Sequence, residues 1–227
     1  MDFSKDDRYY GFAKTELIRM LPGVNGRFLE IGCGEGATLE YLKSAGATYV
    51  AGVDINQDAI AVAEKRGLDL ALAADVERNG LPFKEREFDT IVMADVLEHL
   101  VNPWETLRKL VAYLKDDGHV LLSIPNVRHY RVLRGLIFCG EWAYSDSGIL
   151  DNTHLRFFTL KEIEKLLGHA GLRMADLGWK IHAGSAAKVL NALLLNSLRP
   201  FLIFQYHVLA RKELTRNSQL VTRNCNP

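Results

Sequence analysis

Cysteine is scarce in this chain, and no apolar run is long enough to mark a membrane span. The 227 residues include three cysteines, Cys33, Cys139 and Cys225, and no two of them form a Cys-x-x-Cys pair. This pattern predicts neither a disulfide framework nor a structural zinc site, and it suits a reducing compartment. Polar residues interrupt the leucine-rich stretch 185–198 and keep it short of the ~18 apolar residues that a transmembrane helix needs.

An excess of positive charge is also missing. The 28 lysines and arginines equal the 28 aspartates and glutamates, so a nucleic-acid partner is disfavoured. Residues 2–8 are rich in charged side chains where a signal peptide needs an apolar core, and we therefore expect a cytoplasmic protein. The leucine-rich stretch 185–198 leaves two partners open, a membrane contacted peripherally and a second copy of the chain in a homodimer.

The 48% apolar content is ample for one full core. We expect a single domain over residues 1–212. Its parts are an N-terminal helical cap (1–25), a ligand-binding core (26–125) and substrate-side elements (126–200). The polar residues 213–227 lack periodicity and are expected to form a disordered tail.

Apolar residues at helical spacing predict amphipathic helices at 4–21, 103–114 and 185–198. In the first of these, Tyr9 and Tyr10 either close a ligand pocket or pack against the core, and both interpretations stay open. Short apolar runs between the helical patterns predict strands. These lie just before Gly32 and at 49–54, 70–76, 88–94, 118–125, 172–181 and 203–211.

Strands that alternate with helices require a parallel sheet. Right-handed crossovers then place every strand's carboxyl end along one rim. The predicted fold class is therefore α/β, with a Rossmann-like doubly wound sheet and helical additions at the N-terminus and between the late strands.

The stretch from Phe28 to Gly36 joins a buried strand to a helix through three closely spaced glycines. Such a loop is typical of nucleotide binding, because glycine lets the backbone turn tightly beneath a ligand. The loop alone also fits a dinucleotide fingerprint. Because Glu30 and Glu35 flank it, a pyrophosphate is disfavoured and a cationic ligand such as S-adenosylmethionine (SAM) is favoured.

Two acids follow at the ends of the next two strands. Asp54 is placed to accept hydrogen bonds from both ribose hydroxyls of a nucleotide, and its alternative role is a helix N-cap. Asp75 is placed to meet an adenine amino group with Val76 against the ring, and its alternative role is to cap a loop.

Together these residues resemble the class I SAM-dependent methyltransferases, over about Gly26 to Ser123. The stretch Phe88 to Leu100 is also similar to the F-D-x-I-x-x-x-x-V-L-E-H motif of a subgroup that includes ubiquinone-biosynthesis O-methyltransferases. The resemblance implies a seven-stranded, mostly parallel sheet whose last strand is antiparallel. The cofactor-binding residues that it implies are Glu30, Gly32, Cys33, Gly34, Asp54, Ile55, Asp75, Val76 and Ala94.

Substrate chemistry is expected from the segment Gly148 to Thr159. It resembles the L-D-x-T-H-L-R-F-F-T signature of bacterial methyltransferases associated with glycan or lipopolysaccharide assembly. Thr159 is predicted to cap the following helix. The structural alternative for this segment is an ion pair between Asp151 and Arg156 that only holds the loop.

A hydroxyl acceptor must lose its proton, which calls for a histidine or carboxylate base. His99 and His154 are the candidate bases, with Glu98 in support. We expect Asp95, Glu98 and His99 on one face of a helix, at i, i+3 and i+4. With His154 they also form a candidate divalent-metal site, which resembles that of small-RNA 3′-end 2′-O-methyltransferases but lacks an alignable counterpart of their further ligand pair. A metal-free histidine base is the preferred interpretation.

The sequence thus predicts a SAM-dependent methyltransferase that O-methylates a small molecule, such as a sugar or a glycan or lipopolysaccharide precursor. The alternatives are a quinone-type O-methyltransferase, an RNA 2′-O-methyltransferase, and a SAM-binding partner subunit without activity. A quinone enzyme is expected to show an apolar tunnel beside residues 130–142, and an RNA enzyme a basic surface.

Overall fold

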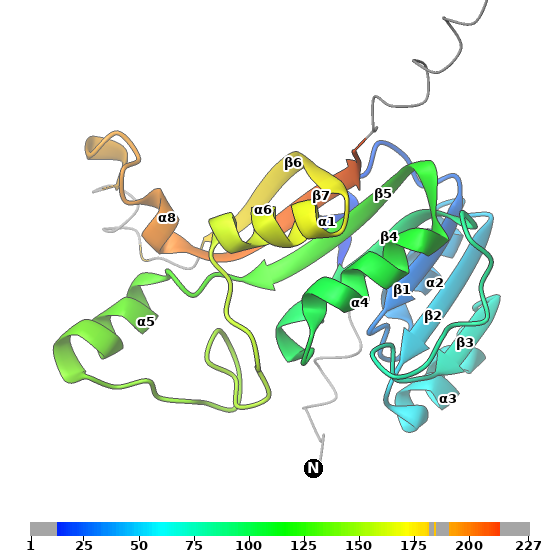
Figure 1. Ribbon diagram of the computed structural model, residues 1–227, viewed down its shortest axis with the longest axis horizontal. Coiled ribbons are helices and arrows are strands. Elements are labelled where there is room, and N and C mark those ends of the chain that lie inside the picture. Colours follow the sequence, from blue (N-terminus) through cyan, green and yellow to red (C-terminus); the bar gives the residue numbers. More distant parts are fainter. Residues whose placement is uncertain (1–12, 182–183, 185–190, 214–227) are drawn as a thin grey trace, which may run out of the picture.

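A computed structural model describes residues 13–181, 184 and 191–213. It contains one seven-stranded sheet with the order β3-β2-β1-β4-β5-β7-β6 (Figure 1). The strands are β1 (Arg27–Ile31), β2 (Tyr49–Asp54), β3 (Leu70–Ala73), β4 (Phe88–Ala94), β5 (Leu114–Pro125), β6 (Leu172–Ile181) and β7 (Ile203–Lys212). β1 to β5 pair in parallel, whereas β7 runs antiparallel to both β5 and β6. The predicted fold class, including the antiparallel last strand, is confirmed.

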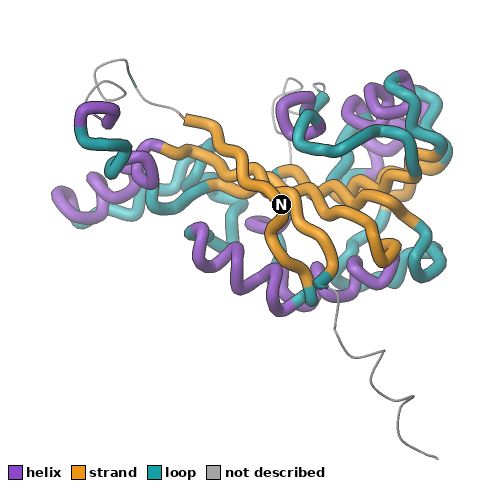
Figure 2. The backbone as a smooth tube through the Cα atoms, turned by 90° about the horizontal axis from the view of Figure 1, so that it is seen from above, coloured by secondary structure: helices purple, strands orange, loops and turns teal. Residues whose placement is uncertain are grey.

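Helices cover both faces of the twisted sheet (Figure 2). Those that pack on it are α1 (Thr15–Ile18), α2 (Ala37–Ser44), α3 (Gln57–Lys65), α4 (Pro103–Leu110) and α6 (Leu160–His169). The short helices α5 (Tyr130–Arg134) and α8 (Arg199–Leu202) lie beyond the carboxyl end of β5 (Figure 1). One apolar core lies between the sheet and α4 and α6, and the other between the sheet and α1, α2 and α3. No helix among the described residues is long and apolar enough to cross a membrane.

The side-chain alternation of β1 shows how the strands divide between these two cores. Leu29 and Ile31 enter the core beneath α4 and α6, and Phe28 enters the other. Because strand side chains alternate with a period of two, Glu30 faces the same side as Phe28, toward α2. The order of strands reverses at β1, which has β2 on one side and β4 on the other. Ligands of doubly wound folds bind at such a switch point, outside the carboxyl ends of the strands.

Side-chain caps fix where the principal helices begin. Asn56 accepts from the backbone of Asp58 and Ala59 at α3, and Asn102 does the same for α4. Thr159 accepts from Glu162 N at 3.4 Å, so its predicted capping of the next helix is confirmed.

Several element boundaries differ from the sequence prediction; the helix expected at 103–114, for example, is α-helical only to Leu110. The third strand ends at Ala73, because the chain turns at Asp75, and the fifth begins at Leu114 after a short 3-10 turn. Of the helix expected at 4–21, only Thr15–Ile18 is helical among the described residues, and Tyr9 and Tyr10 lie outside them. In the predicted helix 185–198, residues 185–190 lie outside the described residues, 191–193 are helical and 194–198 form turns, so the helix does not reach 198. Leu195 and Asn196 have positive φ angles there. Of the predicted tail, residues 214–227 also lie outside the described residues.

Candidate functional site

The loop after β1 takes a left-handed backbone at each of its glycines. Gly32, Gly34 and Gly36 have φ angles of 69°, 51° and 80°. At Gly32 a Cβ would also approach Val96 Cγ2 to 2.5 Å, so both the backbone and the neighbouring turn require glycine. Gly36 is the N-cap residue of α2. The loop therefore brings the positive end of α2 to the rim of the sheet.

The Asp54 carboxylate holds this loop against the end of β2. Its Oδ2 accepts from Gly34 N at 2.7 Å and its Oδ1 accepts from Asn56 N at 2.9 Å. The side chain is buried, whereas Ile55 next to it is exposed at the rim. A carboxylate oxygen can accept two hydrogen bonds, so each oxygen keeps capacity for a ligand hydroxyl.

Glu30 is buried below the loop with one oxygen, Oε2, that has no hydrogen-bond partner among the described residues. Burial raises the pKa of its carboxyl from 4.5 to about 8, although Thr38 and Lys14 act in the opposite direction. Glu35 is paired with Arg66 at 3.4 Å. The loop therefore carries less net negative charge at neutral pH than the sequence indicated. A cationic ligand group beside Glu30 would favour the ionised carboxylate.

Cys33 and Ala94 are buried where their strands meet the rim. Cys33 Sγ fills the space beside Gly52, where an added Cβ would lie 2.7 Å from it. Burial raises the pKa of this thiol, so it stays protonated. The Cys33 side chain thus packs into the core, while its backbone N–H donates to the Val53 carbonyl and its carbonyl accepts from Gly36 N.

Asp75 performs the loop-capping role that was its alternative assignment. Its Oδ1 accepts from Glu77 N at 2.9 Å, and its carbonyl accepts from Arg78 N and Asn79 N. Val76 next to it is half-buried. Both residues lie beyond the end of β3, on the same rim as Asp54.

The prediction that Asp95 shares a helix face with Glu98 and His99 is wrong. Asp95 has a φ of 58°, and only Leu97–His99 form a 3-10 turn. The sharp turn after β4 directs the Asp95 carboxylate to the other side, because Val96 must pack beside Gly32.

The Asp95 carboxylate instead accepts hydrogen bonds from three elements. Its donors are Lys14 Nζ at 3.0 Å, Ser123 Oγ at 3.1 Å and Gln205 Nε2. These residues line a cavity of about 290 Å³ between α1 and the ends of β5 and β7. None of the three donors was identified from the sequence, because they come together only in the folded sheet.

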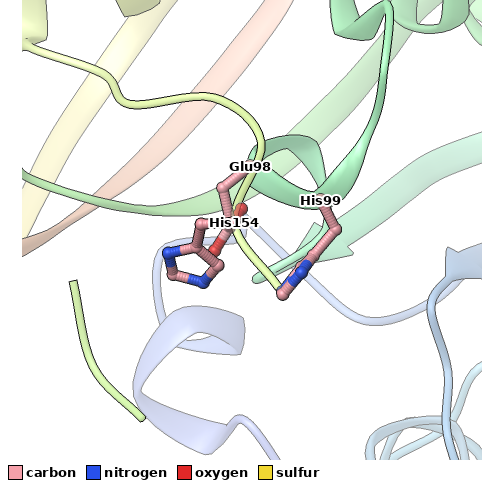
Figure 3. A group of neighbouring side chains, drawn as sticks. All are labelled: Glu98, His99 and His154. Atoms are coloured by element: carbon pink, nitrogen blue, oxygen red, sulfur yellow. The ribbon is translucent and has the colours of Figure 1, made fainter. Parts of the chain in front are cut away.

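Glu98, His99 and His154 form one cluster, although His154 is more than fifty residues away in the sequence (Figure 3). One nitrogen or oxygen from each residue lies within 4.8 Å of the others. Glu98 and His154 are buried and His99 is half-buried. The two imidazole rings meet edge to face, with centroids 4.7 Å apart. Three of the four predicted metal or base residues are therefore brought together, and Asp95 is not.

Backbone hydrogen bonds hold the two halves of this cluster together. The Glu98 carbonyl accepts from Leu155 N at 2.8 Å and from Arg156 N at 3.0 Å. Arg156 donates from its guanidinium to the carbonyl of Val101. The alternative in which Arg156 pairs with Asp151 is therefore not formed, and Arg156 instead ties the loop to the turn after β4.

The Nδ1 atom of each histidine lies within hydrogen-bond distance of a backbone carbonyl. His154 Nδ1 lies 2.9 Å from the Ile149 carbonyl, and His99 Nδ1 lies 3.2 Å from the Thr153 carbonyl. Since a carbonyl can only accept, each Nδ1 carries the proton in the neutral ring and each Nε2 presents a lone pair. One nitrogen of each ring and one oxygen of the buried Glu98 carboxyl group thus lie within 4.8 Å of one another.

Aromatic side chains adjoin His154. Phe157 stacks edge to face on Trp142 at 4.9 Å, and its ring centroid lies 6.4 Å from that of His154. Tyr144 lies 6.3 Å from Phe157 on the same side. Tyr144 is exposed and Trp142 is half-buried, so part of this aromatic cluster is accessible to a ligand.

The strand order, the glycine loop and the acid at the end of β2 define a class I SAM-dependent methyltransferase. A family model described as "Methyltransferase domain" matches residues 6–177, and the chain belongs to this family. The cofactor of the protein is SAM, and its activity is methyl transfer.

Similar proteins agree with this assignment. The chain is 32% identical over 160 residues to the ubiquinone biosynthesis O-methyltransferase of Ralstonia nicotianae, covering 69% of this chain and 66% of that protein. It is 26% identical over 168 residues to the namesake from Hydrogenovibrio crunogenus, covering 72% and 69%. The chain thus spans about two thirds of the length of these relatives. A SAM-dependent methyltransferase structure from Mesorhizobium loti shares the fold, with a TM-score of 0.62, 19% identity and coverage of 87% and 96%.

Proposed function

We propose that this enzyme methylates a hydroxyl group of a small molecule, with a sugar or a glycan or lipopolysaccharide precursor as the acceptor. The observation that carries the proposal is the cluster of Glu98, His99 and His154. Its two Nε2 lone pairs suit the removal of a proton from a hydroxyl, and methyl transfer to a hydroxyl requires this step.

The rim residues fit the bound cofactor in kind and in position. Asp54 would accept from the ribose hydroxyls, and Asp75 with Val76 would contact adenine. Glu30 would accept from the ammonium group of the methionine moiety, which would satisfy its buried Oε2. When bound, SAM supplies an electrophilic methyl group, and the chain's task is to align the acceptor and take up its proton.

His154 and His99 are the two candidates for the base that takes up the proton of the acceptor hydroxyl. Because both Nδ1 atoms donate to backbone carbonyls, neither ring can rotate without breaking a hydrogen bond. A fixed ring keeps its Nε2 aimed at one point, which favours proton transfer from an aligned hydroxyl. Glu98, buried beside them, would stabilise the imidazolium that forms.

The aromatic cluster of Trp142, Tyr144 and Phe157 supports a ring-shaped acceptor. The exposed Tyr144 and the half-buried Trp142 offer flat apolar faces, and the polar edge of the acceptor would then face His154. A sugar has both kinds of surface. The signature in residues 148–159 points to the same class of acceptor.

A quinone-type acceptor is the second candidate, and the names of the relatives favour it. Its aromatic ring would use the same cluster beside His154. RNA is less well supported, because the chain has no net positive charge. A partner subunit without activity is disfavoured by the assembled histidine cluster.

A divalent cation remains an alternative use of the same three side chains. Histidine nitrogens and a carboxylate are ligands for Mg²⁺, Mn²⁺ or Zn²⁺, and a carbonyl on each Nδ1 orients Nε2 toward an ion as well as toward a hydroxyl. Such an ion would lower the pKa of the acceptor hydroxyl. A metal-free base remains our proposal.

The sequence leaves peripheral membrane contact open for the stretch 185–198, in which Leu193 and Leu195 are 74% and 90% exposed. We propose a second place of contact at the segment around α5, which projects away from the sheet (Figure 1). Ile137 and Phe138 are 68% and 81% exposed, and Arg131 and Arg134 are exposed close by in the sequence. Apolar tips beside arginines suit an anionic bilayer. Sedimentation with phosphatidylglycerol vesicles, but not with phosphatidylcholine vesicles, tests this contact, and it should weaken in Phe138→Ser.

The acceptor is tested by transfer of label. Protein is incubated with SAM carrying a labelled methyl group and with fractions of a bacterial extract, and the labelled product is identified by mass spectrometry. A methyl ether on a sugar hydroxyl supports the proposal. A labelled quinone precursor supports the second candidate instead, and label on nitrogen, carbon or sulfur contradicts both.

A further inference from the structure

A chain of hydrogen bonds runs from His99 to a buried carboxylate that the proposed mechanism does not use. His99 Nδ1 lies 3.2 Å from Thr153 Oγ1, and Thr153 Oγ1 donates to Asp151 Oδ1 at 2.6 Å. Asp151 is 3% exposed. The sequence placed Asp151 in the acceptor segment but gave Thr153 no role.

The direction of these hydrogen bonds follows from the number of protons. The Thr153 hydroxyl has one proton, and its 2.6 Å contact with the Asp151 carboxylate shows that it donates this proton to the hydrogen bond with Asp151 Oδ1. Thr153 Oγ1 can then only accept from His99. Both the hydroxyl and the carbonyl of Thr153 therefore accept from His99 Nδ1, and the neutral ring must carry its proton there.

The local backbone fixes this arrangement before any ligand arrives. Thr153 N donates to Asp151 Oδ1 at 2.9 Å, which closes an Asx-turn within the loop. Asp151 N donates to the Gly148 carbonyl, and His154 N donates to the Asp151 carbonyl. The turn that orients His99 is thus continuous with the residue that supplies the second histidine.

We propose that Asp151 and Thr153 are positioning residues, which hold the proton of His99 on Nδ1 and present the Nε2 lone pair to the acceptor. The functional part of this inference rests on the proposed role of His99. The tautomer itself does not, because it follows from the hydrogen bonds alone. The hydrogen bonds from Asp151 through Thr153 orient His99 in the same way whether it acts as a base toward a hydroxyl or as a ligand to a cation.

The test replaces the Thr153 hydroxyl in the full chain. Thr153→Val removes the hydroxyl at nearly constant volume, Thr153→Ser restores it, and Thr48→Val changes an exposed threonine elsewhere as a matched control. Long-range ¹H–¹⁵N correlation spectra report which ring nitrogen carries the proton. The His99 signals are identified among the seven histidines by their loss in His99→Gln.

The wild-type, Thr153→Ser and Thr48→Val proteins should show His99 protonated on Nδ1. Thr153→Val removes one of the two acceptors of His99 Nδ1 and keeps the backbone carbonyl, so it should show a larger share of the Nε2 tautomer than the wild type. A proton on Nε2 in the wild type, or a tautomer ratio in Thr153→Val equal to that of the wild type, would overturn the proposal.

Label transfer from SAM into the acceptor fraction gives the second readout. Thr153→Val should lower the rate roughly 10- to 100-fold and leave the KM for SAM unchanged, and Thr153→Ser should restore most of the rate. If the tautomer ratio shifts in Thr153→Val but the rate does not change, the role of His99 in the proposed function is wrong while the positioning of its ring stands. If both are unchanged, the positioning proposal fails.

Discussion

Replacing Glu30 with glutamine should remove the part of the pH dependence of folding stability that this buried carboxyl causes. Burial raises the pKa of this carboxyl from 4.5 to about 8, so between these values the native protein keeps a proton that the unfolded chain has lost. The native state therefore binds more protons, and stability falls as pH rises. The stabilisation is complete below pH 4.5 and is lost as pH passes through 8.

The expected magnitude is large for a single side chain. One pKa unit corresponds to about 1.4 kcal/mol, so the rise from 4.5 to about 8 corresponds to about 5 kcal/mol of unfolding free energy. Glutamine has nearly the same shape and stays neutral. Glu30→Gln should therefore match the wild type near pH 5 and exceed it in stability by a few kcal/mol near pH 9.

The assay is urea unfolding without SAM, followed by circular dichroism at pH 5, 7 and 9. Glu64→Gln changes an exposed glutamate of α3 and should leave the pH dependence as in the wild type. Parallel pH curves for Glu30→Gln and the wild type would refute the reasoning, because they would show that Glu30 ionises normally in the native protein.

Three further outcomes follow from the site. Asp54→Ala should weaken SAM binding more than 100-fold by calorimetry, since two charge-assisted hydrogen bonds of about 1.5–3 kcal/mol each are lost. The control Asp69→Asn, at the other end of the sheet, should leave the affinity unchanged. An affinity of Asp54→Ala within a few fold of wild type refutes the ribose role. Gly32→Ala should lower the unfolding free energy by more than Gly67→Ala does. Both glycines have a similar positive φ, 75° at Gly67, but a Cβ at Gly67 would meet nothing within 4 Å. Equal losses of unfolding free energy would exclude the clash of Gly32→Ala with Val96. Treatment with a chelator should leave methyl transfer unchanged, and loss of activity that added Mg²⁺ or Mn²⁺ restores would assign the histidine cluster to a metal.

The fold and the cofactor rim could be predicted because their signals are local. A short apolar run, three closely spaced glycines and an acid at a strand end are each recognised from a few neighbouring residues. The sheet then brings Gly32, Asp54 and Asp75 to one rim by topology alone. The charge argument was less secure, since it depended on the burial of Glu30 and on the partner of Glu35.

The acceptor side was only partly predictable for the opposite reason. A helix after β4 would have placed Asp95 beside His99, but the left-handed turn at Asp95 depends on how Val96 packs against Gly32. No local pattern encodes that contact. The role of Thr153 was likewise not predictable, because it depends on a hydrogen bond to His99, which lies 54 residues away in the sequence.

The central claim is that SAM is held by the rim while the histidine cluster acts on the acceptor. It is tested most directly by measuring label transfer and SAM affinity together in the wild type, His99→Ala and His154→Ala. We predict that both variants bind SAM with nearly wild-type affinity and lose most of their methyl transfer. Transfer at the wild-type rate in both variants would contradict the claim, as would a loss of transfer fully explained by a loss of SAM binding.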